Sequence, residues 1–151
     1  MKSRTVRIFL DSNVILSGLL SDRGAPRIIL DIACLEIPFI SVLTGQYNII
    51  EIERNLTRKL PQALPVYQKY LSKLNMEIIP LPEVDAVKKA SQFMNAKDAP
   101  VVASAVLGCA DYLVTGDRKD FSRLKKSRKY PFDIVTPAEL LEVLFEGMRE
   151  D

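Results

Sequence analysis

The sequence contains no histidine among its 151 residues. This absence excludes catalytic triads built on histidine, zinc sites with histidine ligands, and acid–base chemistry by imidazole. Any enzymatic chemistry must therefore come from carboxylate, lysine, hydroxyl or tyrosine side chains, or from a bound metal ion.

Cysteine is scarce as well, with Cys34 and Cys109 as its two occurrences. Both lie in apolar stretches, far apart in the sequence and without the spacing of a metal site. Free cysteines in apolar surroundings are usually buried, so we expect two buried free thiols.

Long apolar runs are also missing, because none reaches the roughly 18 residues that a membrane span needs. The basic start of the chain leads into only five strand-like residues, so we expect no signal peptide and a cytoplasmic protein. The length fits a single domain over residues 1–151, large enough for a core without disulfides or structural metal.

The net charge is only +2, but the basic residues are unevenly distributed. Seven of them lie between residues 118 and 129, with Asp120 as the one acid in that stretch. A smaller basic group consists of Arg54, Arg58 and Lys59. Such groups indicate either a solvated surface or a contact with a polyanion.

Strand-like segments alternate with helical ones along the whole chain. The predicted strands cover residues 6–10, 38–42, 76–81, 112–115 and 132–135. The predicted helices cover residues 12–20, 26–35, 46–60, 63–74, 84–94, 98–109 and 136–147, the last opened by a capping box. The crossovers are long enough for parallel neighbours, so we expect an α/β three-layer sandwich with a mostly parallel central sheet flanked by helices.

Acidic residues follow two of the predicted strands directly. Asp11 comes after residues 6–10, and Asp117 comes just after residues 112–115. Ligands of open parallel sheets bind beyond the carboxyl ends of the strands, so both acids are candidates for one site. Asp98 starts a helix, and the 46–60 helix offers a fourth acid. Capping is the plain alternative for Asp98 and Asp11, and an ordinary turn for Asp117.

A cluster of carboxylates is costly unless a cation compensates their repulsion. Mg²⁺ and Mn²⁺ are the natural cations for a site made only of oxygen ligands. Such an ion lowers the pKa of a bound water and polarises a phosphoryl oxygen. The chemistry most compatible with these residues is therefore phosphodiester hydrolysis.

Four segments together resemble the PIN-domain nucleases over about residues 6 to 145. They read VRIFLDSNVILSGLL, EIERNL, KDAPVVASAVLGCADYLVTGD and DIVTPAEL. The likeness is greatest to the VapC-like toxins of toxin–antitoxin pairs, which are similar in length and in the Gly-x-Pro after the first helix, here Gly24-Ala25-Pro26.

The resemblance implies a metal-dependent endoribonuclease that cleaves single-stranded RNA with metal-activated water. Its catalytic acids would be Asp11, Glu51, Asp98 and Asp117, with Asp11, Asp98 and Asp117 as the metal ligands. Glu53 is the competitor of Glu51, because a helical wheel places it nearer the apolar stripe. The two glutamates differ by about 200° around a helix, so they cannot both face one site.

The resemblance also assigns supporting residues. Asn13 would orient Asp11 and the local loop, and Thr115 would supply a hydroxyl near the metal. Arg118 and Lys119, directly after Asp117, are the expected contacts of the RNA phosphates.

Many family members carry further acids just before the position of Asp98. Here Asn95, Ala96 and Lys97 stand there, so a second metal position is expected to be weak or filled only with substrate. The expected partners, implied by the family, are an RNA substrate, a small antitoxin and a second copy of the chain, with no membrane.

Two other functions fit parts of the pattern. A degenerate PIN-like module would bind RNA or a protein without cleaving. A haloacid-dehalogenase-like phosphatase also begins with a strand that ends in aspartate. That class needs a second aspartate two residues later, where this chain has Asn13, and it leaves Asp98 without a role.

Overall fold

The computed structural model of the chain describes residues 5–116 and 130–149. Five strands in this part form one sheet of order β3-β2-β1-β4-β5, and every neighbouring pair is parallel. The strands are β1 (Val6–Leu10), β2 (Ile40–Gly45), β3 (Met76–Ile79), β4 (Tyr112–Val114) and β5 (Asp133–Val135). The central strand is therefore the first in the sequence.

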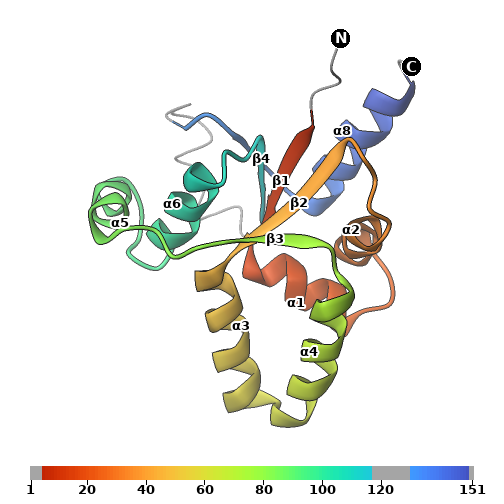
Figure 1. The fold of residues 1–151 in the computed structure, drawn as a ribbon, viewed down its shortest axis with the longest axis horizontal. Helices are drawn as coiled ribbons and strands as arrows, with labels where there is room; N and C mark the ends of the chain where they lie inside the picture. Colours follow the sequence, from red (N-terminus) through yellow and green to blue (C-terminus); the bar gives the residue numbers. More distant parts are fainter. Residues whose placement is uncertain (1–4, 117–129, 150–151) are drawn as a thin grey trace.

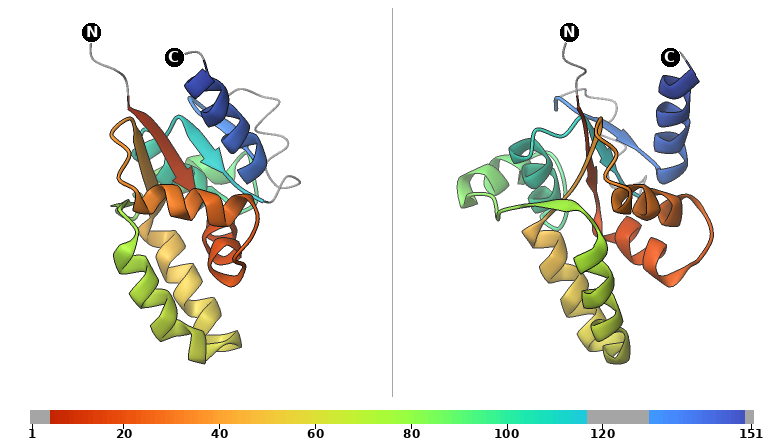
Figure 2. Two further views of the ribbon diagram at one scale, coloured as in Figure 1. Left: turned by 90° about the vertical axis from the view of Figure 1, so that its right-hand side faces the viewer. Right: turned by 45° about the vertical axis from the view of Figure 1, so that its right-hand side comes forward.

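Helices cover both faces of this sheet (Figures 1 and 2). One face carries α1 (Ser12–Leu20), α2 (Ala25–Cys34) and α8 (Pro137–Arg149), and the other carries α5 (Val84–Ser91) and α6 (Ala99–Leu107). This arrangement confirms the predicted three-layer α/β fold with its parallel sheet.

The alternation of side chains along β1 supplies the core on both faces. Ile8 and Leu10 belong to the hydrophobic cluster formed with α1, α2 and α8. Phe9, between them, belongs to a second cluster with Val101 and Val102 of α6. These three side chains are at most 1% exposed, as expected for a central strand covered by helices on both faces.

A helical hairpin extends beyond the carboxyl edge of the sheet (Figure 1). It consists of α3 (Gln46–Lys59), the short 3₁₀ helix η1 (Pro61–Ala63) and α4 (Leu64–Lys73). Because α3 begins directly after β2, its first turns lie at the edge where the candidate acids were expected. Ile52 and Leu56 of α3 and Tyr67 of α4 are buried in the first cluster, which fixes the hairpin to the body.

The second strand differs from its predicted bounds. The apolar run favoured residues 38–42, whereas β2 starts at Ile40 and continues to Gly45. The extension is stabilised by β3, whose residues Ile78 and Ile79 pair with Thr44 and Gly45. Thr44 and Gly45 are not apolar, so the local pattern stopped short of them.

The prediction of buried thiols is wrong, because Cys34 and Cys109 are both exposed. Cys34 is the last residue of α2, and Cys109 follows α6 with a left-handed φ of 54°. Their neighbours Ala33 and Ala110 are the buried residues, at 3% and 4% exposure. An apolar stretch at the end of a helix therefore does not bury every member.

Polar contacts of Arg7 connect strands at the amino edge of the sheet, opposite the edge where the candidate acids lie. Its guanidinium donates to Glu77 Oε2 at 2.6 Å, and its backbone N–H donates to Asp111 Oδ2 at 2.9 Å.

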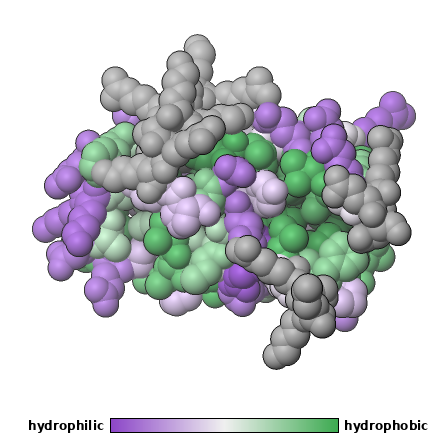
Figure 3. Space-filling view, turned by 90° about the horizontal axis from the view of Figure 1, so that it is seen from above, coloured by the Kyte–Doolittle hydropathy of each residue, from purple (hydrophilic) through white to green (hydrophobic). Residues whose placement is uncertain are grey.

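The surface seen from the amino edge of the sheet mixes polar and apolar areas (Figure 3). No helix within the described residues combines the length and apolar character needed to cross a membrane.

Candidate active site

Asp11 follows the central strand and lies at the start of α1. Its backbone has extended angles, and its Oδ1 accepts a hydrogen bond of 2.7 Å from the N–H of Ser12. The residue is 8% exposed. The plain reading of Asp11 as a helix cap is therefore correct, but the cap bond uses one of its two carboxylate oxygens.

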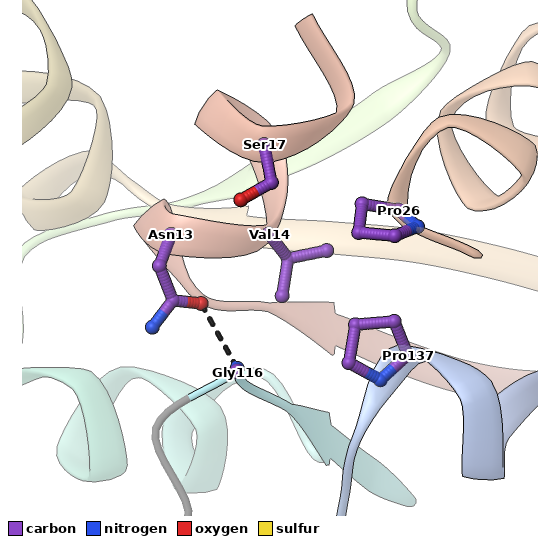
Figure 4. A pocket seen from close by; sticks show the side chains of 6 residues that line it. All are labelled: Asn13, Val14, Ser17, Pro26, Gly116 and Pro137. Atoms are coloured by element: carbon purple, nitrogen blue, oxygen red, sulfur yellow. Dashed lines mark hydrogen bonds between the residues drawn. The ribbon is translucent and has the colours of Figure 1, made fainter. Parts of the chain in front are cut away.

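The second carboxylate oxygen is oriented from β4. The hydroxyl of Thr115, which is 2% exposed, donates to Asp11 Oδ2 at 2.9 Å. Asn13 Nδ2 lies 3.4 Å from the Thr115 hydroxyl, and Asn13 Oδ1 accepts from the N–H of Gly116 at 3.1 Å (Figure 4). Asn13 thus links the start of α1 to the segment directly before Asp117.

Two pockets meet at Asn13. One has a volume of about 350 Å³ and is lined by Asn13, Val14, Ser17, Pro26, Gly116 and Pro137 (Figure 4). The other has a volume of about 190 Å³, is lined by the acids and is called the carboxylate pocket below. Its lining residues are Asp11, Ser12, Asn13, Leu16, Glu51, Asn55, Lys97, Asp98 and Val101.

Asp98 stands directly before α6 and is 7% exposed. It occupies the N-cap position, but its side chain makes no capping hydrogen bond, and its φ of −91° and ψ of −20° are helical. N-cap residues that cap usually have extended angles. The capping explanation therefore fails for Asp98, whose side chain lines the carboxylate pocket.

The glutamates of α3 point in different directions. Glu51 lines the carboxylate pocket with Asp11 and Asp98. Glu53 lies near Tyr67 of α4, since after burial its charge is the second cause that raises the pKa of that phenol. The structure thus brings Glu51 to the other acids and turns Glu53 toward the hairpin partner.

Tyr47 reports the negative potential at this pocket. Burial raises the pKa of its phenol, and the charges of Glu51, Asp98 and Asp11 raise it further, whereas the charge of Arg54 opposes them. The three carboxylates are therefore close enough together to act on one phenol.

Asn48 is a residue of the site that the sequence did not single out. Its side chain is fully buried, and Nδ2 donates to the Ser12 hydroxyl at 2.9 Å and to Asp11 Oδ1 at 3.4 Å. A signal was available, because Asn48 precedes Glu51 by three residues and Ile52 by four. A polar residue at that spacing lies between the buried and the pocket face of the helix.

Asp117, Arg118 and Lys119 lie outside the described residues. Among the residues that are described, no three acids, cysteines or histidines gather closely enough to form a metal-binding group. The described part of the site consists of two nearly buried aspartates and one glutamate that line a common pocket. In the sequence, Asp117 directly follows Gly116.

Comparisons with known proteins address the family. Residues 7–119 match the sequence model of the PIN domain. Among curated proteins, a sequence search gives no significant match.

Solved structures share the fold at low sequence identity. VapBC2 from Rickettsia felis, bound to a promoter DNA fragment, aligns with a TM-score of 0.64 and 14% identity over 87% of this chain and 98% of that one. PAE2754 from Pyrobaculum aerophilum aligns with a TM-score of 0.62 and 17% identity over 93% and 90%. A toxin–antitoxin complex from Klebsiella pneumoniae aligns with a TM-score of 0.55 and 20% identity over 86% and 97%.

The match covers the acids of the carboxylate pocket, the central strand and the Thr-Gly-Asp segment after β4. The solved structures share the fold of this chain, with its parallel five-stranded sheet. The chain belongs to the PIN domain family.

Proposed function

We propose that this protein is a metal-dependent endoribonuclease that cleaves single-stranded RNA, and that it is the toxin of a toxin–antitoxin pair. The observation that carries the proposal is the common pocket of Asp11, Glu51 and Asp98 at the carboxyl edge of a PIN-type sheet. Asp117 is proposed as the fourth acid.

The donor atoms of the pocket are of the kind that a hard divalent cation binds. Asp11, Glu51 and Asp98 do not by themselves gather closely enough to form a metal-binding group, so the proposed site includes Asp117. Their donors are carboxylate oxygens, the ligands that Mg²⁺ and Mn²⁺ prefer. Asp11 and Asp98 are 8% and 7% exposed, and burying two carboxylates near each other is unfavourable without compensating charge. Asp11, Asp98 and Asp117 would hold the ion, and Glu51 would complete the site.

When bound, the ion would supply an activated water and polarise the scissile phosphoryl group. The chain supplies orientation. The hydrogen bonds from Ser12, Thr115 and Asn48 hold both oxygens of Asp11. Such outer contacts fix the geometry of a metal ligand and are often needed for full affinity.

Lys97 changes what the pocket offers near Asp98. It is exposed and lines the carboxylate pocket, at a place where other PIN proteins carry acids. An ammonium group there compensates negative charge without a second ion and suits a phosphate. We therefore propose one tightly held metal ion, with any second one bound together with the RNA.

Partners follow from the neighbours by analogy. One solved relative of the fold is a VapBC2 assembly and another is a toxin–antitoxin complex. We propose a small antitoxin that enters the cleft and presents a basic residue to the carboxylates. A homodimer and a cytoplasmic location are proposed from the family resemblance alone, and sedimentation of the purified chain would test the dimer.

The test combines metal binding and cleavage. Purified protein is titrated with Mn²⁺ by calorimetry and then incubated with single-stranded RNA, next to Asp98→Asn. We expect one binding event and cleavage by the wild type, both strongly reduced in the variant, because the amide removes a charged ligand. Metal binding without cleavage, or neither, would favour the non-catalytic module. Equal cleavage by both proteins would point to a contaminant or another site.

A further inference from the structure

The carboxylate pocket is negatively charged, whereas its proposed substrate is a polyanion. Arg118 and Lys119 were expected to offset this repulsion, but they lie outside the described residues. Cationic side chains elsewhere around the pocket therefore become important. Lys97 lines the pocket itself. Beyond it, the small basic group on α3 begins three residues after Glu51, and the proposed catalytic site does not use this group.

The face of α3 that lines the pocket continues into this basic group. Glu51 and Asn55 line the carboxylate pocket, and Arg58 follows them at spacings of seven and three residues. Arg54 follows Glu51 by three residues. Side chains three, four and seven apart share one side of an α-helix, so all four lie in one stripe.

Arg54 is near the acids as well as on the right face. Its charge lowers the pKa of the Tyr47 phenol, against the effects of Glu51, Asp98 and Asp11 on the same group. The charges of all four residues therefore act on the same phenol. Tyr47 is partly buried against the second core cluster, which fixes the start of the stripe.

Both arginines are exposed, and neither forms an ion pair or hydrogen bond with another described residue through its guanidinium. They are available to an external anion. Arg54 and Arg58 are four residues apart, so they are displaced by about 6 Å along the helix axis. This distance is comparable to that between neighbouring phosphates of an extended strand.

The direction of α3 gives the stripe an orientation. The helix starts at the carboxyl edge of the sheet and runs away from the body (Figures 1 and 2). Arg54 and Arg58 therefore lie at increasing distance from the acids, as contacts with successive phosphates on one side of a scissile bond would.

We propose that Arg54 and Arg58 form a track on α3 that binds the phosphate backbone of the RNA strand as it leaves the carboxylate pocket. The track rests on the proposed ribonuclease function and names the side of the pocket that the substrate occupies. It reads phosphates and not bases, so it contributes affinity and position without sequence preference.

The chain offers a matched control on the other helix of the hairpin. Lys69 and Lys73 of α4 are exposed, lie four residues apart, and also reach the last turn of their helix. The α3 side that carries Glu53 faces α4, whereas Glu51 is turned by about 200° toward the pocket. The lysine pair is thus separated from the pocket by α3, although its removal changes the net charge equally.

The test is RNA binding in the presence of a chelator, so that cleavage does not interfere. Anisotropy of a fluorescein-labelled single-stranded RNA oligonucleotide is measured at several salt concentrations for wild type, R54A/R58A and K69A/K73A. Loss of two phosphate contacts should reduce the slope of log K against log salt by about 1.4 and weaken binding several-fold. The lysine variant should keep the wild-type slope, and melting curves should show both variants folded.

Three results would overturn the track: no RNA binding by the wild type, equal slopes for the wild type and R54A/R58A, or equal losses in both double variants. Cleavage with Mn²⁺ is measured separately on the same proteins. Cleavage with an unchanged slope would reject the track and keep the ribonuclease function. The expected slopes without any cleavage would reject the ribonuclease function and keep the track.

Discussion

The hydroxyl of Thr115 donates a hydrogen bond of 2.9 Å to Oδ2 of Asp11, although the two residues are 104 positions apart in the sequence. The contact joins the ends of the adjacent strands β4 and β1. It fixes the one carboxylate oxygen of Asp11 that the helix cap does not use. The proposed metal ligand is thus oriented from two elements.

Replacing Thr115 by valine should therefore weaken metal binding. The change keeps the shape of the buried side chain and removes the donor to Asp11. We expect Mn²⁺ affinity to fall about ten- to hundred-fold, as for other residues that orient a ligand. Thr115→Ser keeps the hydroxyl and should stay close to wild type in calorimetry. Equal affinity of the valine variant and the wild type would mean that Asp11 needs no such support.

Asn48→Asp should destabilise the protein at neutral pH. The variant has nearly the same shape, but it replaces the amide that donates to Ser12 and Asp11 by a carboxylate beside Asp11. Lost donors and like charges in a buried place should cost about 1–3 kcal/mol in the free energy of unfolding. Urea unfolding measures this cost.

Asn55→Asp is the control for Asn48→Asp, because Asn55 lines the same pocket from the same helix but is partly exposed. It should change the free energy of unfolding by much less. A similar loss in both variants would indicate that pocket charge alone, and not the buried amide of Asn48, determines stability.

Gly45→Ala should disturb the junction between β2 and α3. A Cβ at this position would lie 2.9 Å from Asn48 Oδ1 and 3.1 Å from the Ser104 hydroxyl, both on buried side chains. Overpacking of this kind costs typically 1–3 kcal/mol. Gly147→Ala in α8 meets nothing within 4 Å and should stabilise the helix slightly. In thermal unfolding, we expect the midpoint temperature of Gly45→Ala to fall below that of the wild type and the midpoint temperature of Gly147→Ala to rise slightly above it.

Tyr67 should control stability at alkaline pH. Burial, followed by the charge of Glu53, raises the pKa of this phenol from 10.0 to about 12. The unfolded chain loses the proton first, so the contribution of Tyr67 is fully present below pH 10 and is lost as the pH rises toward 12. In Tyr67→Phe, the free energy of unfolding should therefore fall less steeply between pH 10 and pH 12 than in the wild type, as measured by urea unfolding.

At neutral pH the same variant should be as stable as the wild type or more stable. Tyr67 is 2% exposed, and its hydroxyl has no hydrogen-bond partner among the described residues. Removing a buried donor without a partner leaves no polar group unsatisfied. A clear loss of stability at neutral pH would contradict this account of Tyr67.

The sequence predicted the parts of the molecule that local patterns determine. The apolar run of β1 and the periodicity of α1 predicted their bounds, Val6–Leu10 and Ser12–Leu20, correctly. The capping box at the start of α8 is also present, with Thr136 and Glu139 exchanging hydrogen bonds of 2.9 and 3.2 Å. These features depend on residues within a few positions of each other.

Features that depend on distant residues were missed or left open. The end of β2 at Gly45 is fixed by pairing with β3, and the role of Asn48 appears only when α3 lies against the start of α1. Helical periodicity left Glu51 and Glu53 as alternatives, because the choice depends on where α6 and α4 pack around α3. The contacts of Asp117 remain a prediction.

The most direct test of the account uses these two glutamates. Single-turnover cleavage of end-labelled single-stranded RNA with Mn²⁺ is compared for wild type, Glu51→Gln and Glu53→Gln. Both variants make the same isosteric change two residues apart on α3, but only Glu51 lines the pocket with Asp11 and Asp98. We predict a loss of at least about a hundredfold in Glu51→Gln, of the order seen when a group acting in the transition state is removed, and wild-type cleavage by Glu53→Gln. Equal rates in both variants, or a loss only in Glu53→Gln, would contradict the proposed site.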